Sequence, residues 1–337
     1  MDGFVAPTSY RALRVDVQDG VARREVAAVP WETLPDLDVT VRVSHSSLNY
    51  KDALSATGNR GVTRRFPHTP GIDAAGTVVA SRDPRFAPGD AVLCTGYDLG
   101  MDTPGGMAEY VRVPADWLVR RPPGLDAFTA MALGTAGFTA ALALDRLRAA
   151  GVEPGLGPLV VTGASGGVGS LAVALLARAG FEVVASTGKP GAAALLSRLG
   201  AARLIPREEL GAVGDRPLAP AAYAGGVDTV GGATLAGLLK STVVGGAVAA
   251  CGLVGGAELP LTVFPFILRG VALMGVTSQH ANAAVRDQVW GRLAADAGLL
   301  SLLADGDLVR HVPLEGLEAE IGAILAGRVT GRVVVTI

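Results

Sequence analysis

The sequence has few cysteines and no excess of charge of either sign. The two cysteines among its 337 residues, Cys94 and Cys251, lie in apolar runs typical of buried strands. This pattern excludes a disulfide framework and favours a reducing, cytoplasmic location. A net charge of −2 and a pI near 6.1 indicate no surface for nucleic acids or anionic membranes. The N-terminus also lacks the basic and apolar segments of a signal peptide.

Charged residues are scarce as well, at 18%, whereas hydrophobic residues make up 50% of the chain. The mean hydropathy of +0.41 raises the question of a membrane span. In the least charged stretch, residues 241–276, the only charged residues are Glu258 and Arg269, but several glycines and prolines interrupt it. A membrane-spanning helix needs about 20 consecutive apolar residues. We therefore expect short buried strands of a parallel sheet here, and no membrane segment.

The first 125 residues have the pattern of an all-β unit. Two strand-like runs on either side of Asp19-Gly20 predict a hairpin. Residues 38–49 alternate between apolar and polar with a period of two. Short strands separated by Gly and Pro turns follow, so the pattern predicts a barrel-like β unit.

The pattern changes near Asp126, where a helical segment begins that ends at Gly151. Strands and helices then alternate, which is typical of a doubly wound parallel sheet. We expect strands at residues 159–162, 182–186, 203–205, 227–230 and 247–251, with helices at 170–179, 192–199 and 234–240. The C-terminal part is mixed, with a helix expected at 284–297 and a final strand in the segment GRVVVTI.

The glycine-rich segment TGASGGVGS, residues 162–170, lies between the first of these strands and the first of these helices. Its glycines allow a tight turn and the close approach of a pyrophosphate, at which the first amides of the helix point. A turn that only packs the helix on the strand is the alternative. The strand–turn–helix context favours nucleotide binding.

The end of the second strand bears on the choice of nucleotide. An NAD site usually has Asp or Glu about 20 residues after the glycines, to bind the ribose 2′-hydroxyl. Here the next acidic residue after Glu182 is Glu208. The segment instead contains Ser186, Thr187 and Lys189, and Arg203 and Arg207 lie near the end of the third strand. Hydroxyls and cations suit a 2′-phosphate, so we expect NADPH, although Lys189 as a solvated surface residue is the alternative.

At this point the sequence resembles the medium-chain dehydrogenase/reductase superfamily, and more narrowly its zinc-free group of acrylyl-CoA reductases and putative quinone oxidoreductases. The segments that carry the resemblance include SLNYKDALSATG, FPHTPGIDAAGTV, GTAGFTA, VVTGASGGVGS, DTVGG, ACGL and LPLTVFPFILRGVALMGVTS. The resemblance implies an α/β protein of two domains. A GroES-like β-barrel catalytic domain is expected at residues 1–125 and 276–337, and a Rossmann NADPH-binding domain with a doubly wound parallel sheet at 126–275.

Zinc enzymes of this superfamily have ligand residues that this chain lacks. The first loop reads Leu48-Asn49-Tyr50-Lys51-Asp52 and the second motif Pro70-Gly71-Ile72-Asp73, and no cysteine follows Cys94 in the region of the structural zinc lobe. A catalytic zinc needs three protein ligands. The four histidines, at positions 45, 68, 280 and 311, have no ligand spacing. We therefore expect no metal site.

The resemblance and the motifs together nominate the site residues. Tyr50 is the expected donor to a developing enolate oxygen or a contact of the cofactor, and Asn49 and Asp52 are further catalytic candidates. The alternative for Asp52 is a cap or brace of the loop. The expected cofactor contacts are Tyr50, Ser165, Gly166, Gly167, Val168, Thr187, Gly188, Lys189, Arg207, Leu253, Ile267 and Ser278. The segment GNRGVTRRFP contains three arginines, Arg60, Arg64 and Arg65. Arg64 and Arg65 could bind the phosphates of coenzyme A, and the alternative is that they belong to a solvated loop.

Three functions remain open from the sequence. The first is an NADPH-dependent, metal-free reductase that transfers hydride to the β-carbon of a short 2-enoyl-CoA such as acrylyl-CoA. The second is an NADPH:quinone oxidoreductase, and the third is an NADPH-binding protein with a structural or RNA-binding role. A homodimer is also expected, because the apolar run Val271–Val276 is placed last in the sheet, where a partner's strand would cover it.

Overall fold

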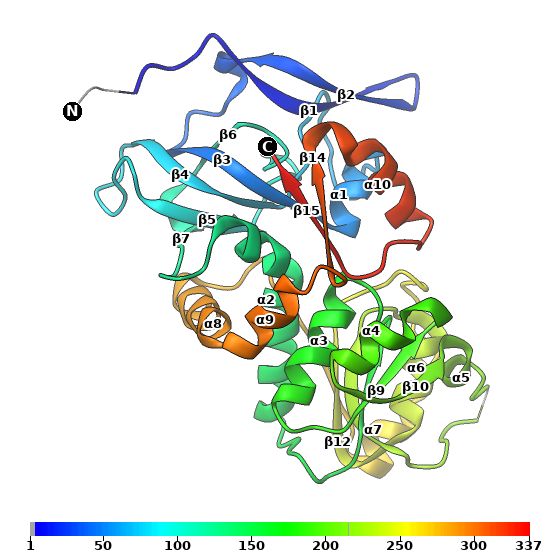
Figure 1. Cartoon of the computed structure of the whole chain (residues 1–337). Helices are drawn as coiled ribbons and strands as arrows, with labels where there is room; N and C mark the ends of the chain where they lie inside the picture. Colours follow the sequence, from blue (N-terminus) through cyan, green and yellow to red (C-terminus); the bar gives the residue numbers. More distant parts are fainter. Residues whose placement is uncertain (1–3, 215) are drawn as a thin grey trace. The chain divides into compact units, whose positions relative to one another are not determined.

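The computed structural model describes residues 4–214 and 216–337 (Figure 1). The chain divides into two compact units. The first contains the residues up to Thr135 together with Gln279–Ile337, and the second contains Ala136–Ser278. Both limits come slightly later in the chain than the domain limits expected from the sequence. The change of pattern near Asp126 marks the start of helix α2 (Ala127–Ala149), whose first two turns belong to the first unit.

The first unit is built on β-sheets. Strands β1 (Ser9–Gln18) and β2 (Val21–Pro30) form the expected antiparallel hairpin, and its turn residues have positive φ, 53° at Asp19 and 79° at Gly20. The larger sheet has the order β14-β15-β3-β4-β5-β7, with β6 paired to β3. Its strands are β3 (Val39–Leu48), β4 (Asp73–Ser81), β5 (Ala91–Thr95), β6 (Tyr110–Val113), β7 (Leu118–Arg120), β14 (Val309–Pro313) and β15 (Arg332–Thr336).

The C-terminal strand completes this sheet. Strand β15, red in Figure 1, lies between β14 and β3, parallel to the first and antiparallel to the second. The helices of this unit are α1 (Tyr50–Ala56), α8 (Ala283–Ala295), α9 (Ala297–Ala304) and α10 (Leu317–Leu325), with short 3-10 turns η1 (Trp31–Thr33), η2 (Ala115–Trp117) and η4 (Leu314–Gly316). Helix α1 packs on α10 in the core cluster that contains Ala53, Ala56, Leu317 and Ile321.

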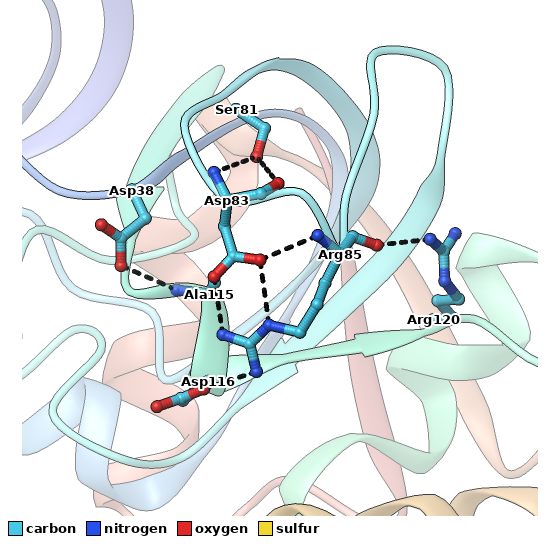
Figure 2. Close-up of polar contacts among 7 residues, drawn as sticks. All are labelled: Asp38, Ser81, Asp83, Arg85, Ala115, Asp116 and Arg120. Carbon is cyan, nitrogen blue, oxygen red and sulfur yellow. Dashed lines mark hydrogen bonds and ion pairs between the residues drawn. The ribbon is translucent and has the colours of Figure 1, made fainter.

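An exposed polar cluster joins the loop after β4 to the turn η2 (Figure 2). Arg85 donates to Asp83 through both its backbone N–H and its Nε, each at 2.9 Å from Oδ1, and its Nη1 lies 2.7 Å from Oδ1 of Asp116. These contacts hold the pKa of Asp83 down to about 2. Because exposed ion pairs contribute little to stability, we assign this cluster to local loop geometry and not to function.

The second unit is the doubly wound parallel sheet predicted from the sequence. Its six strands have the order β10-β9-β8-β11-β12-β13, and every pair is parallel. They are β8 (Leu159–Thr162), β9 (Val183–Thr187), β10 (Ala201–Pro206), β11 (Tyr223–Asp228), β12 (Thr242–Ala250) and β13 (Ala272–Gly275). The helices are α3 (Gly167–Arg178), α4 (Ala193–Arg198), α5 (Arg207–Gly211), α6 (Gly232–Lys240) and α7 (Phe264–Arg269), with the 3-10 turn η3 (Pro190–Ala192).

The apolar stretch from 241 to 276 divides into β12, α7 and β13. The two strands were expected, whereas helix α7, with Pro265 in its first turn, was not, and β13 is only half buried. Strand β13 is at the edge of the sheet, which confirms the expected place of the run Val271–Val276.

Within the described residues, one helix, α2, is long and apolar enough to cross a membrane, but 78% of its most apolar window is buried in the protein. The core helices of soluble proteins share these properties, and Gly134, with a φ of 51°, interrupts α2.

Candidate active site

The glycine-rich turn forms a backbone cradle at the end of β8. Gly163 has a φ of 59°, and Gly166 is the N-cap of α3 without a side-chain cap. A Cβ at Gly169 would lie 2.2 Å from the carbonyl oxygen of Gly163, so only glycine lets the helix approach the strand this closely. No side chain of the described residues caps the first backbone N–H groups of α3, at Gly167 and Val168. These groups are therefore available to bind an anion such as a phosphate.

Hydroxyl and cationic groups gather beside this cradle, at the ends of β9 and β10. The hydroxyls of Ser165 and Thr187 lie 2.9 Å apart, and the backbone N–H of Lys189 donates to Oγ1 of Thr187 at 3.1 Å. The guanidinium of Arg207 lies across Gly188, where a Cβ would be 2.1 Å from its Nε. Burial and then the nearby Arg207 lower the pKa of Lys189.

This donor set fits the 2′-phosphate of NADPH. Two cations close together repel each other unless an anion lies between them. Nε of Arg207 lies 3.9 Å from Oε1 of Glu208, and both side chains are mostly exposed. The Oγ of Ser186 is buried at the same end of β9, and it has no hydrogen-bond partner among the residues that the structure describes. The residues predicted for the adenosine half of the cofactor are thus brought together, and the arrangement favours a phosphate over a free ribose hydroxyl.

Only one of the residues expected to contact the nicotinamide half of the cofactor lines a pocket. A pocket of about 400 Å³ opens at the ends of β12 and β13, lined by Ala250, Cys251, Gly252, Leu253, Gly275, Val276 and Thr277. Leu253 belongs to this lining as expected, whereas Ile267 and Ser278 do not, and Ile267 is 67% exposed on α7. Cys251 lines the pocket, but burial raises the pKa of its thiol to about 12, so it is no nucleophile at neutral pH.

The segment expected to be a loop, Asn49 to Asp52, is instead the start of helix α1. Asn49 is the N-cap, and Oδ2 of Asp52 accepts its backbone N–H at 2.8 Å. The other oxygen of Asp52 accepts the backbone N–H of Ile72, also at 2.8 Å. Asp52 is fully buried and joins the two motifs, so its side chain is a brace, which was the alternative reading of this residue.

A buried charged network lies under this turn. Oδ2 of Asp73 accepts hydrogen bonds from Oγ of Ser47 at 2.6 Å and Nδ2 of Asn49 at 2.9 Å. The guanidinium of Arg332 donates to Oγ of Ser47 at 2.9 Å and to Oδ1 of Asn49 at 3.2 Å. Burial and the charge of Asp73 raise the pKa of Asp52 to about 7.

Asp73 and Arg332 were not predicted as site residues. The available signal was a charged residue at the start of an apolar strand in each case, in GIDAAGTV and GRVVVT. Such residues are rarely buried unless they are paired. The two positions are 259 apart in the chain, and β3 lies between β4 and β15 in the sheet. The order of the strands in the sheet therefore brings Asp73 and Arg332 into one network. No pattern of neighbouring residues in the sequence predicts it.

The remaining predicted residues are near the surface. Tyr50 follows the N-cap, its side chain is 38% exposed, and its hydroxyl has no hydrogen bond within the described part of the chain. Nε of Arg64 donates to Oδ2 of Asp102 at 2.6 Å, and its backbone N–H donates to Oδ1 at 3.0 Å. Asp102 thus neutralises Arg64, whereas Arg65 is exposed and keeps its charge available.

The residues do not fit a zinc ion. Within residues 4–214 and 216–337, no three His, Cys, Asp or Glu side chains lie together in a way that could hold a metal. Asn49 and Tyr50 stand at the start of α1, and burial raises the pKa of the Cys94 thiol to about 12.

A parallel sheet with a glycine-rich phosphate cradle, in a chain with a second β-rich unit, defines the class of two-domain nicotinamide-nucleotide oxidoreductases. The family description "Alcohol dehydrogenase GroES-like domain" matches residues 35–123, and "Zinc-binding dehydrogenase" matches residues 167–294. The chain belongs to the medium-chain dehydrogenase/reductase superfamily, in the group that includes acrylyl-CoA reductases and putative quinone oxidoreductases. The expected GroES-like and Rossmann fold classes are confirmed.

Three proteins of this group are similar to the chain along nearly its whole length. The chain is 47% identical to acrylyl-CoA reductase AcuI of Ruegeria pomeroyi, over 97% of this chain and 99% of the relative. It is 45% identical to the putative quinone oxidoreductase YhfP of Bacillus subtilis, with the same two coverages, and the crystal structure of YhfP has NAD bound. The crystal structure of the YhdH oxidoreductase from Salmonella enterica in complex with NADP is 46% identical, with a TM-score of 0.92 over 97% of this chain and 99% of that one.

Proposed function

We propose that this protein is an NADPH-dependent, metal-free reductase that transfers hydride to the β-carbon of a short 2-enoyl-CoA such as acrylyl-CoA. The observation that supports NADPH as the cofactor is the pair of cations, Lys189 and Arg207, beside Thr187 at the end of β9. The substrate class is supported by the 47% identity to acrylyl-CoA reductase AcuI along nearly the whole chain. The two units correspond, in this proposal, to a catalytic domain and a cofactor domain.

The residues of the chain divide the work. NADPH supplies a hydride when it is bound. The amides at the start of α3 hold its pyrophosphate, Thr187, Lys189 and Arg207 hold its 2′-phosphate, and Leu253 lines the nicotinamide pocket. The network around Asp73 and Arg332 orients the first turn of α1. The hydroxyl of Tyr50 on that turn has no hydrogen bond within the described residues, and its proposed role is to contact the cofactor ribose or the thioester oxygen.

Reduction of the substrate needs a group that stabilises the negative charge of the enolate and a group that donates a proton. Addition of hydride at the β-carbon moves the electrons of the C=C bond onto the thioester oxygen, and the α-carbon must then be protonated. The exposed guanidinium of Arg65 is the proposed handle for the phosphates of coenzyme A, since Asp102 already pairs with Arg64.

A quinone is the second candidate acceptor, because the chain is also 45% identical to the putative quinone oxidoreductase YhfP. Oxidation of NADPH with acrylyl-CoA, crotonyl-CoA and a soluble quinone, measured side by side, decides between them. We expect the highest kcat/KM with acrylyl-CoA. A preference for the quinone would reject the enoyl-CoA proposal, and equal or better use of NADH would reject the choice of cofactor.

We also propose that the protein is a cytoplasmic homodimer. Within the described part of the chain, strand β13 has a neighbour on one side only, and its unit has exposed apolar side chains, including Leu273, Ile267 and Leu268. An uncovered apolar edge of this kind favours pairing with the same strand of a second copy. A mass near 34 kDa in light scattering at micromolar concentration would reject the dimer.

A further inference from the structure

Lysine is almost absent from this chain. Of its 29 basic residues, three are lysines and the others are arginines. Nζ of Lys240 donates to the carbonyl oxygen of Gly214 at 2.7 Å, which is a structural role, and Lys189 belongs to the proposed phosphate site. Lys51 is the one lysine that neither role explains.

Lys51 is the second residue of α1, directly after Tyr50, and its side chain is partly buried. Its Nζ lies 3.1 Å from Oε1 of Gln279 and 3.9 Å from Sδ of Met101. No carboxylate among the described residues forms an ion pair with it. The adjacent Asp52 directs its oxygens to the backbone N–H groups of Asn49 and Ile72 instead.

This environment leaves the ammonium group poorly satisfied. An ammonium has three N–H donors, of which the Gln279 amide oxygen takes one, while a thioether is a weak acceptor. Burial lowers the pKa of Lys51, and the charge of Asp52 opposes this only in part. A lysine with a lowered pKa is a stronger acid than one in water, whereas an arginine at this position would not release a proton at all.

We propose that Lys51 is a catalytic residue that delivers the proton to the α-carbon of the substrate. This inference rests on the proposed enoyl-CoA reduction. The hydride forms the new C–H bond at the β-carbon, and the C=C electron pair becomes the enolate. An N–H bond of Lys51 then breaks as the α-carbon takes the proton, which leaves a neutral amine that regains a proton from solvent. Until then the positive charge next to the developing enolate stabilises it.

The stereochemistry at the α-carbon tests this assignment. Reduction of acrylyl-CoA by NADPH in D₂O places one deuterium on that carbon, and we expect the wild type to form a single configuration. In Lys51→Met we expect kcat to fall about 100-fold or more, the usual loss for a general acid, and the residual product to contain both configurations. Lys51→Arg should behave in the same way, because it keeps the charge but not the acid.

Two further variants sharpen the result. Tyr50→Phe should keep the single configuration, and Arg328→Met, which removes an exposed cation of the same unit, should match the wild type. The proposal is overturned if Lys51→Met keeps kcat within about threefold together with the single configuration, if Lys51→Arg restores both, or if Tyr50→Phe is the variant that loses configurational control.

A measurement without turnover gives independent evidence. With three lysines in the chain, reductive ¹³C-methylation gives few NMR signals, and the signal of Lys51 is the one that Lys51→Arg removes. We expect it to titrate below the ordinary lysine range in the free protein, and titration at or above that range contradicts the proposal. A wild type that reduces neither acrylyl-CoA nor crotonyl-CoA rejects the proposed function, and the role of Lys51 with it. A wild type that reduces them just as Lys51→Met does rejects the role of Lys51 alone.

Discussion

The cofactor cradle and the first turn of α1 are built by opposite means. In the cradle, backbone groups do most of the work, since Gly163, Gly166 and Gly169 leave room where side chains would fill it. At α1, buried charged side chains from β4 and β15 hold the turn in place. The first kind of site fails when atoms are added, and the second fails when a partner is removed.

Removal of a charge from the buried network should have the largest effect. Asp73→Ala leaves the guanidinium of Arg332 buried without its counter-charge, which typically costs about 3–5 kcal/mol. We expect a large fall in the thermal midpoint of the protein. Asp36→Ala, which breaks the exposed pair with Arg82, is the matched control and should change the midpoint little. Equal shifts for the two variants would mean that the network does not brace the turn.

Addition of one methyl group to the cradle should have the next largest effect. In Gly169→Ala the new Cβ would meet the carbonyl oxygen of Gly163 at 2.2 Å, so the backbone must move. Overpacking of this kind costs about 1–3 kcal/mol, and the displaced amides should also weaken NADPH binding. Calorimetry with NADPH measures both. Gly191→Ala is the control, because its Cβ would meet nothing within 4 Å, and wild-type binding by Gly169→Ala would contradict the cradle.

Loss of a cation at the end of β9 should separate the two cofactors. Lys189→Ala removes a charge-assisted hydrogen bond to the proposed 2′-phosphate, which is worth about 1–3 kcal/mol, while NADH has no phosphate at this position. We therefore expect kcat/KM to fall for NADPH and to change little for NADH. A similar loss with both cofactors would show that Lys189 only shapes the loop.

The smallest expected effect is a pH dependence of stability. The pKa of Asp52 is raised to about 7 in the folded protein, above its ordinary value of 3.8, so the folded state binds this proton more tightly than the unfolded state. Its contribution to stability is present at low pH and is lost as the pH rises from the ordinary value to about 7, by at most about 1.4 kcal/mol per unit, with no further loss above 7. Between about pH 5 and 7 the wild type should lose more thermal stability than Asp52→Asn. Parallel curves for the two proteins would contradict the raised pKa.

The predictability of the two sites follows the same division. The alternation of strands and helices, the glycine turn and the lack of an acid at the end of β9 are local patterns, and they predicted the parallel sheet and a nicotinamide cofactor. The cofactor contacts expected from them stay a prediction, and Ile267 lies on α7, outside the lining of the pocket. The expected loop at residues 48–52 is a helix start, where Asn49 and Asp52 form a capping box, in agreement with the alternative reading of Asp52 as a cap or brace.

The sequence by itself determined the alternation of strands and helices in the second unit, the glycine-rich turn after β8 and the place of Lys189 just after β9. These features depend on residues that are close in the chain, where side-chain period and glycine positions act directly on the backbone. Only the tertiary structure decided that Asp73 and Arg332 share one buried network, that Arg207 lies across Gly188, and that Lys51 meets Gln279 and not a carboxylate. Such pairs are brought together by the order of the strands and by packing, and the physical properties of a buried charge depend on those neighbours, not on its position in the sequence.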